Sequence, residues 1–139
     1  MHKFFLSFLI CTFALLSIQV AEATTSYDKN GRKTGSYKTS GSTTTKYNKY
    51  GQKEATYKKS GSTTTSYDKS GRKTGSYRTS GSTTTSYDKY GRKTGSYRTS
   101  GNTTTSYDKS GRKTGSYKKN SNGTITEYDK HGRKVGSYR

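Results

Sequence analysis

The sequence predicts an all-β protein made of antiparallel β-hairpins repeated in tandem, as a meander or a β-solenoid. Three observations lead to this prediction. Tyrosines recur every ten residues from Tyr27 to Tyr117. Threonine, serine and tyrosine, which favour extended backbone, fill the segments between glycine-containing turns. The stretches 66–85 and 86–105 differ at only two positions. Such a fixed period is the signature of a repeat architecture.

Residues 1–23 are expected to be a secretory signal peptide. Lys3 supplies the positive charge, residues 4–20 are nearly all apolar, and Ala21-Glu22-Ala23 matches a signal-peptidase site. A membrane anchor is the alternative, but the apolar run is only 17 residues long and no basic cluster follows it directly. We therefore expect cleavage after Ala23, no transmembrane segment in the mature chain, and a location outside the cell, at its surface or in the periplasm.

The mature chain, residues 24–139, lacks the aliphatic residues of an ordinary globular core. Ile125 and Val135 are its only branched aliphatic residues, beside 14 tyrosines and no cysteine. The net charge is +19. Low hydrophobicity with high net charge is typical of chains that do not fold alone. We expect an isolated monomer to be marginally stable or disordered unless its hairpins close into a coil or barrel, stack with other chains, or bind a partner.

About six units of 20 residues follow the signal peptide, each with two strands and two tight turns. In the unit that starts at Ser66, the loop 69–71 suits a type I turn followed by a left-handed glycine. This loop sets Asp68 opposite Arg72 and Tyr67 opposite Lys73. The same register, followed along the two strands, sets Thr63 opposite Tyr77.

The second turn of the unit is predicted to be a three-residue loop as well, Thr79-Ser80-Gly81. It would set Tyr77 opposite Thr83 and would place the recurring tyrosines on one face of the sheet, beside threonine and lysine. Such cross-strand pairs contribute about 0.2–1 kcal/mol each. The predicted aromatic ladder consists of Tyr67, Tyr77, Tyr87, Tyr97, Tyr107 and Tyr117.

The element Tyr-Asp-x-x-Gly-Arg starts at five tyrosines, Tyr27, Tyr67, Tyr87, Tyr107 and Tyr128, and a variant, YNKYGQ, starts at Tyr47. This series resembles the YD repeats of Rhs-type proteins over essentially the whole mature chain. Members of that family are large exported or surface bacterial proteins whose repeats form β shells around toxins or bind cell-surface carbohydrate. The resemblance implies a β-repeat fold and export, although this chain has no toxin domain. It is also similar, more distantly, to the 20-residue repeats of wall-, choline- and glucan-binding modules, without their tryptophans.

Residues suited to catalysis or metal binding are not grouped in this sequence. His131 is the only histidine after residue 23, at a turn position that holds serine or tyrosine in other units. The carboxylates are mostly one per repeat, each with a cation nearby. No pair of acids for proton transfer and no ligand spacing for a metal is present. We expect no enzymatic activity, no cofactor and no metal.

Basic residues interleaved with tyrosines predict binding to anionic polymers, namely anionic polysaccharide, wall polymer or nucleic acid, without sequence specificity. The alternative is that these charges only keep the sheet soluble and protect its edges. The candidate binding residues are Lys69, Arg72, Lys73, Arg78, Lys89, Arg92, Lys93, Arg98, Lys109, Arg112 and Lys113.

Other functions fit parts of the pattern. Near-identical polar units without proline could self-associate into a fibre or matrix subunit that resembles functional amyloid, although the net charge opposes this. The Gly-Arg-Lys sequences would suit an amidated-peptide precursor, which does not explain the tyrosine period. Threonine runs such as 63–65 could order ice, but their role as strand formers fits the strongly basic chain better.

Overall fold

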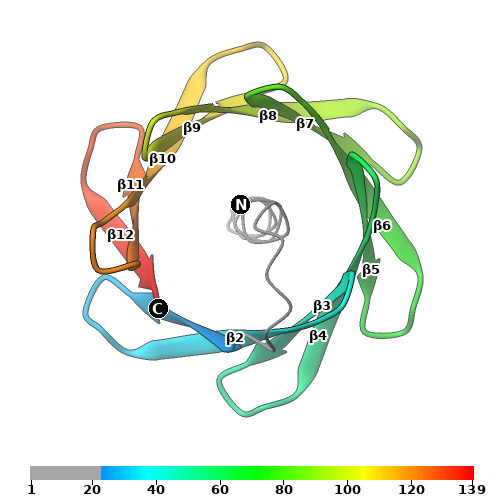
Figure 1. Cartoon of the computed structure of the whole chain (residues 1–139), viewed down its shortest axis with the longest axis horizontal. Coiled ribbons are helices and arrows are strands. Elements are labelled where there is room, and N and C mark those ends of the chain that lie inside the picture. Colours follow the sequence, from blue (N-terminus) through cyan, green and yellow to red (C-terminus); the bar gives the residue numbers. More distant parts are fainter. Residues whose placement is uncertain (1–22) are drawn as a thin grey trace.

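The computed structural model describes residues 23–139, which form twelve antiparallel strands in one closed barrel (Figure 1). Each strand pairs with its neighbours in the chain, so the predicted all-β array of hairpins is confirmed, as a meander. The predicted signal peptide lies outside the described residues, apart from Ala23. The strands are β1 (Ala23–Asp28), β2 (Lys33–Ser40), β3 (Thr43–Asn48), β4 (Lys53–Ser60), β5 (Thr63–Asp68), β6 (Lys73–Ser80), β7 (Thr83–Asp88), β8 (Lys93–Ser100), β9 (Thr103–Asp108), β10 (Lys113–Lys119), β11 (Ile125–Asp129) and β12 (Lys134–Tyr138).

The barrel closes where β1 pairs with β12, so that the blue first strand lies beside the red last one (Figure 1). Ser26 lies opposite Tyr138 in this pair. The Arg139 N–H donates to the Thr25 carbonyl over 2.9 Å, and the Thr25 N–H donates back to the Arg139 carbonyl. Among residues 23–139, closure gives every strand two hydrogen-bonded neighbours, which removes the exposed edges of an open array.

The six turns from an odd strand to the next even strand are built on an aspartate or asparagine. In the β5–β6 turn, the Asp68 N–H donates to the Arg72 carbonyl over 2.9 Å, which confirms the predicted pairing of these residues. Asp68 Oδ1 accepts the N–H groups of Ser70 and Arg72, each over 2.9 Å. Gly71 has φ +82°, the left-handed conformation that glycine adopts at low cost.

The turns from an even strand to the next odd strand differ from the prediction. Ser80 pairs with Thr83, so the β6–β7 loop contains only Gly81 and Ser82. Gly81 has φ +55° and Ser82 does not have a positive φ. This combination is the pattern of a type II′ hairpin, in which glycine takes the first loop position. The predicted loop Thr79-Ser80-Gly81 is therefore wrong, because it placed glycine last.

A β-bulge in the odd-to-even hairpins changes which side chains share a face. Tyr67 pairs with Lys73 as predicted, but Ser66 pairs with Gly75, so Thr74 is an extra residue in β6. The extra residue shifts the register by one, and Thr64, not Thr63, lies opposite Tyr77. A shift of one residue moves a side chain to the other face of the sheet.

The inner face of the barrel contains one tyrosine from each even strand. These six tyrosines are 3–8% exposed and form one cluster with Ile125. Because they come from six strands spread around the closed ring, they can form one cluster only on its inner face. Tyr77 lies opposite Thr64 on one side and Ser86 on the other, not opposite Thr83 as predicted. Large and small side chains therefore alternate around the wall and replace an aliphatic core. The inner tyrosines are Tyr37, Tyr57, Tyr77, Tyr97, Tyr117 and Tyr138.

The odd strands place a second set of tyrosines on the outer face. These side chains are half-buried, and two of them pack near a cation of the preceding hairpin. Lys58 Nζ lies 5.6 Å from the Tyr67 ring centroid, and the Arg139 guanidinium carbon lies 5.9 Å from that of Tyr27. The predicted single ladder is therefore wrong, since its members divide between two faces. The outer tyrosines are Tyr27, Tyr47, Tyr67, Tyr87, Tyr107 and Tyr128.

Candidate anion-binding rim

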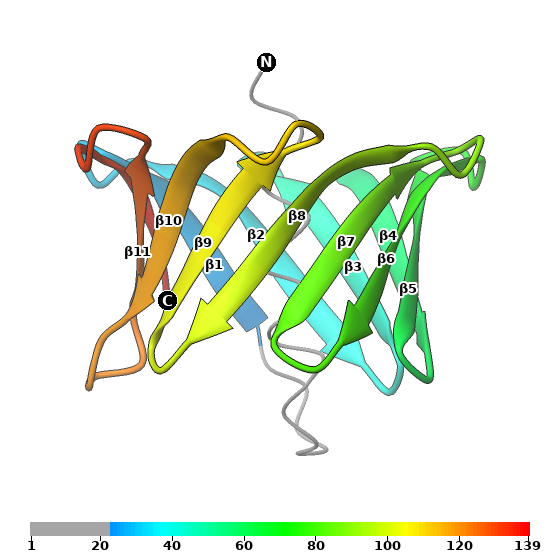
Figure 2. The same ribbon diagram turned by 90° about the horizontal axis from the view of Figure 1, so that it is seen from above.

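The two ends of the barrel differ in charge. All odd-to-even turns lie at one end and splay outward, as the red β11–β12 turn shows at the top of Figure 2. Of the 26 lysines and arginines in residues 23–139, seventeen lie in or next to these turns, and all seventeen are exposed. We call this set the basic rim: Lys29, Arg32, Lys33, Lys49, Lys53, Lys69, Arg72, Lys73, Lys89, Arg92, Lys93, Lys109, Arg112, Lys113, Lys130, Arg133 and Lys134.

The turns at the opposite end are uncharged. Four of them are two-residue loops of glycine followed by serine or asparagine. The fifth, between β10 and β11, is one residue longer: Ser121-Asn122-Gly123 lies between Asn120 and Thr124. Its Asn120 N–H donates to the Thr124 carbonyl over 2.8 Å. Lys119, the exposed last residue of β10, is the one cation directly next to these five turns, compared with seventeen cations in or next to the six turns of the other end.

The turn aspartates of the basic rim hold the turns together. Asp88 Oδ1 accepts the N–H groups of Tyr90 and Arg92 over 2.9 Å each, and its Oδ2 accepts Arg92 Nε over 2.7 Å. The hydrogen bond from the Arg92 backbone is the main cause that lowers the pKa of Asp88. In the same way, the Arg133 backbone N–H lowers the pKa of Asp129 to about 2. Both carboxylates are thus ionised at neutral pH, and both oxygens of each accept hydrogen bonds within the turn.

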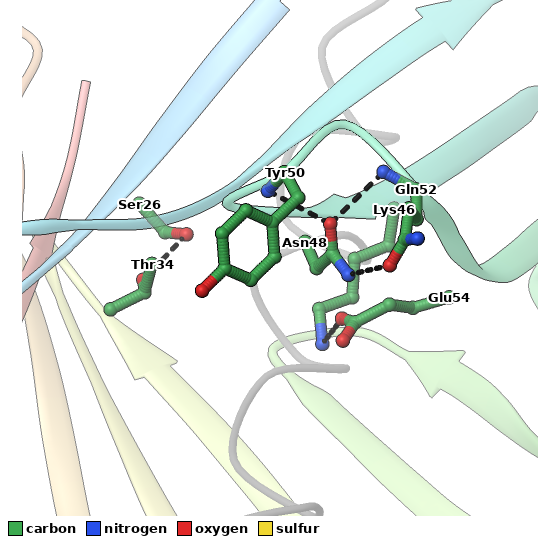
Figure 3. Close-up of polar contacts among 7 residues, drawn as sticks. All are labelled: Ser26, Thr34, Lys46, Asn48, Tyr50, Gln52 and Glu54. Atoms are coloured by element: carbon green, nitrogen blue, oxygen red, sulfur yellow. Dashed lines mark hydrogen bonds and ion pairs between the residues drawn. The ribbon is translucent and has the colours of Figure 1, made fainter.

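Hairpin β3–β4 shows that this turn needs an acceptor and not a charge (Figure 3). Asn48 Oδ1 accepts the N–H groups of Tyr50 and Gln52 over 2.9 Å each, and Asn48 Nδ2 donates to Gln52 Oε1 over 2.9 Å. The Asp–Arg pair that is missing from YNKYGQ is therefore replaced by a neutral pair with the same backbone bonds.

Cations outnumber carboxylates strongly at this end. Only five turn aspartates and Glu54 accompany the seventeen cations of the rim. Among the described residues, only Arg92 and Arg133 form ion pairs with turn aspartates, each with an Nε–Oδ2 distance of 2.7 Å. Most rim cations can therefore contact a polyanion without first breaking an ion pair.

The structure separates the predicted binding residues into two groups. Nine of the eleven belong to the basic rim, whereas Arg78 and Arg98 lie on the outer wall, opposite threonines of neighbouring strands. The eleven predicted residues belong to three units. The remaining rim cations occupy the equivalent positions of the other hairpins, and the repeat period identifies them. The cations of the outer wall are Lys38, Lys58, Arg78, Arg98, Lys118 and Arg139.

Large side chains project into solvent at the basic end, a feature that sequence reasoning missed. Tyr50 and Tyr90 are 75% and 70% exposed at the tips of their turns, and Val135 is 41% exposed at the start of β12. Lys49 Nζ and Lys89 Nζ each lie 4.8 Å from the centroid of the adjacent tyrosine ring. The signal in the sequence was the replacement of serine by tyrosine at one turn position.

Two hairpins also depart from the repeat on the inner face. In four hairpins, a threonine donates to a serine, as Thr34 does to Ser26 over 2.9 Å (Figure 3). The β3–β4 hairpin has an ion pair between Lys46 and Glu54 instead, with nitrogen and oxygen 2.5 Å apart. In β11–β12, Glu127 accepts hydrogen bonds from the hydroxyl of Tyr138 at 2.7 Å and from the hydroxyl of Tyr117 of β10 at 3.4 Å.

Three of the inner tyrosines, Tyr37, Tyr117 and Tyr138, are held in their neutral form. Burial is the main cause that raises the pKa of Tyr37, Tyr117 and Tyr138, and the negative charge of Glu127 adds to it. The Tyr37 hydroxyl is buried and has no hydrogen-bond partner. A phenol of this kind is a poor proton donor and acceptor at neutral pH.

The described residues contain no group of three or more histidine, cysteine or acidic side chains that could hold a metal ion. Within the same part of the chain, no helix is long and apolar enough to cross a membrane. A scan against protein-family models gives no match for the chain, and no curated protein matches it significantly.

Proposed function

We propose that this chain is a secreted, non-enzymatic protein whose basic rim binds anionic polymers at a cell surface or in an extracellular matrix. The observation that supports it most is the gathering of seventeen exposed cations at one end of the barrel. The resemblance to YD repeats, some of which bind cell-surface carbohydrate, agrees with the proposal.

The repetition of the turn explains how weak contacts would add up. An exposed lysine or arginine gains little from one anion, but a polymer carries many anionic groups on one chain. Contacts after the first are made within the complex, which raises the overall affinity. Because binding releases counterions, affinity is expected to fall steeply with salt. Polysaccharide, wall polymer and nucleic acid share the repeated phosphate, carboxylate or sulfate that this mechanism needs.

The alternative of a fibre or matrix subunit is less well supported. It relies on strand edges that pair with further chains, whereas each described strand already has two neighbours. The alternative of a peptide precursor would require cutting the Gly-Arg-Lys turns on which the hairpins depend. No observation favours either alternative over the proposal.

The test is retention of chain 23–139, which contains all twelve strands, on sulfated glycan, wall polymer and DNA columns over a salt series. A rim variant, Arg72→Gln with Arg112→Gln, copies the natural Gln52. A wall variant, Arg78→Gln with Arg98→Gln, removes the same charge elsewhere. We expect the rim variant to elute at lower salt than the wall variant. Equal elution of the two variants, or no retention on any polymer, would contradict the proposal.

A further inference from the structure

The exposed apolar residues are arranged around the basic end in a regular way. Tyr50, Tyr90 and Val135 are the only large apolar side chains that are exposed in residues 23–139, and all three lie at this end. They belong to hairpins β3–β4, β7–β8 and β11–β12, which are every second hairpin of the ring. Tyr50 and Tyr90 lie at turn tips, whereas Val135 is the extra residue of the β11–β12 bulge.

The two tyrosines have no evident role in the fold of their turns. Ser70 and Ser110 occupy the same position in other hairpins, and each donates its backbone N–H to the turn aspartate, as Tyr90 does. The tyrosine rings are 75% and 70% exposed and lie beside cations of their own turns, such as Lys89 and Arg92 beside Tyr90. These rings are therefore available to a partner.

We propose that the basic rim docks end-on against an anionic lipid bilayer, with Tyr50 and Tyr90 in the headgroup region. This docking rests on the proposed function, because it uses the same basic rim. It adds the flat surface of a bilayer to the anionic polymers as a partner of that rim. Lysine and arginine near an anionic leaflet are attracted to it, while tyrosine favours the boundary between headgroups and acyl chains. The structure places both kinds of side chain at one end.

The shape of the rim favours a flat partner over one linear chain. A plane that meets the barrel end can touch all six splayed turns at once (Figure 2). A single polymer strand that crosses the mouth meets only some of them. The turns of the other end contain neither charged nor large apolar residues, so they offer a bilayer fewer contacts than the basic rim does.

Sedimentation of chain 23–139 with vesicles tests this proposal. Phosphatidylcholine vesicles that contain phosphatidylserine are compared with pure phosphatidylcholine vesicles. The key variant is Tyr50→Ser with Tyr90→Ser, which converts the β7–β8 turn into the YDKSGR sequence of two other hairpins and so preserves folding. The reciprocal variant is Ser70→Tyr with Ser110→Tyr. Neither variant changes the charge.

We expect binding only to the vesicles with phosphatidylserine, a loss on the order of tenfold for the tyrosine-to-serine variant, and a gain for the reciprocal variant. Elution from sulfated glycan should change little in both, because the charge is unchanged. Equal binding to neutral vesicles, or no effect of the tyrosine substitutions, overturns the docking. Retention on glycan without vesicle binding overturns the docking and leaves the proposed function standing. Loss of both overturns both.

Discussion

Tyr67 and Tyr77, ten residues apart in one hairpin, lie on opposite faces of the barrel wall. Tyr67 lies outside, half-buried beside Lys58, whereas Tyr77 is 8% exposed in the inner cluster. The bulge at Thr74 separates them, because one extra residue reverses the alternation of side chains. Two tyrosines in equivalent sequence contexts therefore have different structural roles.

The two tyrosines should differ in their effect on stability. Tyr77→Ser removes a buried ring from the inner cluster, and we expect it to lower the free energy of unfolding by about 3–5 kcal/mol. Tyr67→Ser removes a half-exposed ring and should cost about 1 kcal/mol or less. Urea denaturation of both variants measures the difference. Equal costs would show that the two faces are not assigned correctly.

The buried hydroxyls offer a second contrast within the same ring. Tyr37 has no partner for its hydroxyl, so Tyr37→Phe should leave stability unchanged or raise it by up to about 1 kcal/mol. Tyr138 donates to Glu127, and Tyr138→Phe should lower stability by about 1–2 kcal/mol because the carboxylate loses a charge-assisted bond. Thermal denaturation of both variants tests this order, and a reversed order would count against it.

The turn aspartates should be replaceable by asparagine but not by alanine. Asp68→Asn recreates the acceptor that Asn48 supplies in β3–β4, so the melting temperature should change little. Asp68→Ala leaves the N–H groups of Ser70 and Arg72 without their acceptor and should lower the melting temperature by several degrees. Identical melting temperatures for the two variants would mean that the side-chain oxygen does not stabilise the turn.

Alkaline pH should unfold the barrel through its inner tyrosines. Burial raises the pKa of Tyr37, Tyr117 and Tyr138 above the value of 10.0 expected in an unfolded chain. Below pH 10 these phenols are protonated in both states. Above it only the unfolded state ionises, so each of the three lowers stability by about 1.4 kcal/mol per pH unit. We expect phenolate absorbance of these residues to appear together with the loss of β circular dichroism; ionisation of all tyrosines in an intact fold would contradict this.

The sequence was sufficient to predict strands, hairpins and one of the two turn types. The Asp68 turn was predictable because aspartate, glycine and loop length all specify the same conformation. The Gly81 turn was not, because a glycine after Thr79-Ser80 fits the last place of a three-residue loop as well as the first place of a two-residue loop. The strand register depends on that choice and on the bulge at Thr74, and the register decides which tyrosines face inward and which face outward.

The basic rim could be predicted only in part. The cations are visible in every unit, but whether Arg72 and Arg78 share a surface depends on which turns meet at one end. The up-and-down order of the strands decides this, since it sends all six odd-to-even turns to the same edge of the sheet, and closure gathers that edge into a ring. No local pattern encodes closure, because the pairing of β1 with β12 joins residues more than a hundred positions apart.

Closure is the claim on which the rim, the inner cluster and both proposals depend, and one cross-link tests it. Thr25 and Arg139 exchange backbone hydrogen bonds, so their Cα atoms are within the range that a disulfide spans. The chain has no cysteine after residue 23. Chain 23–139 with Thr25→Cys and Arg139→Cys is oxidised and run on a non-reducing gel, with Thr25→Cys and Thr85→Cys as the control pair from strands across the ring. We expect a monomeric intramolecular cross-link for the first pair and none for the control. Failure of the first pair to cross-link within the monomer, or equal cross-linking of both pairs, would contradict the barrel.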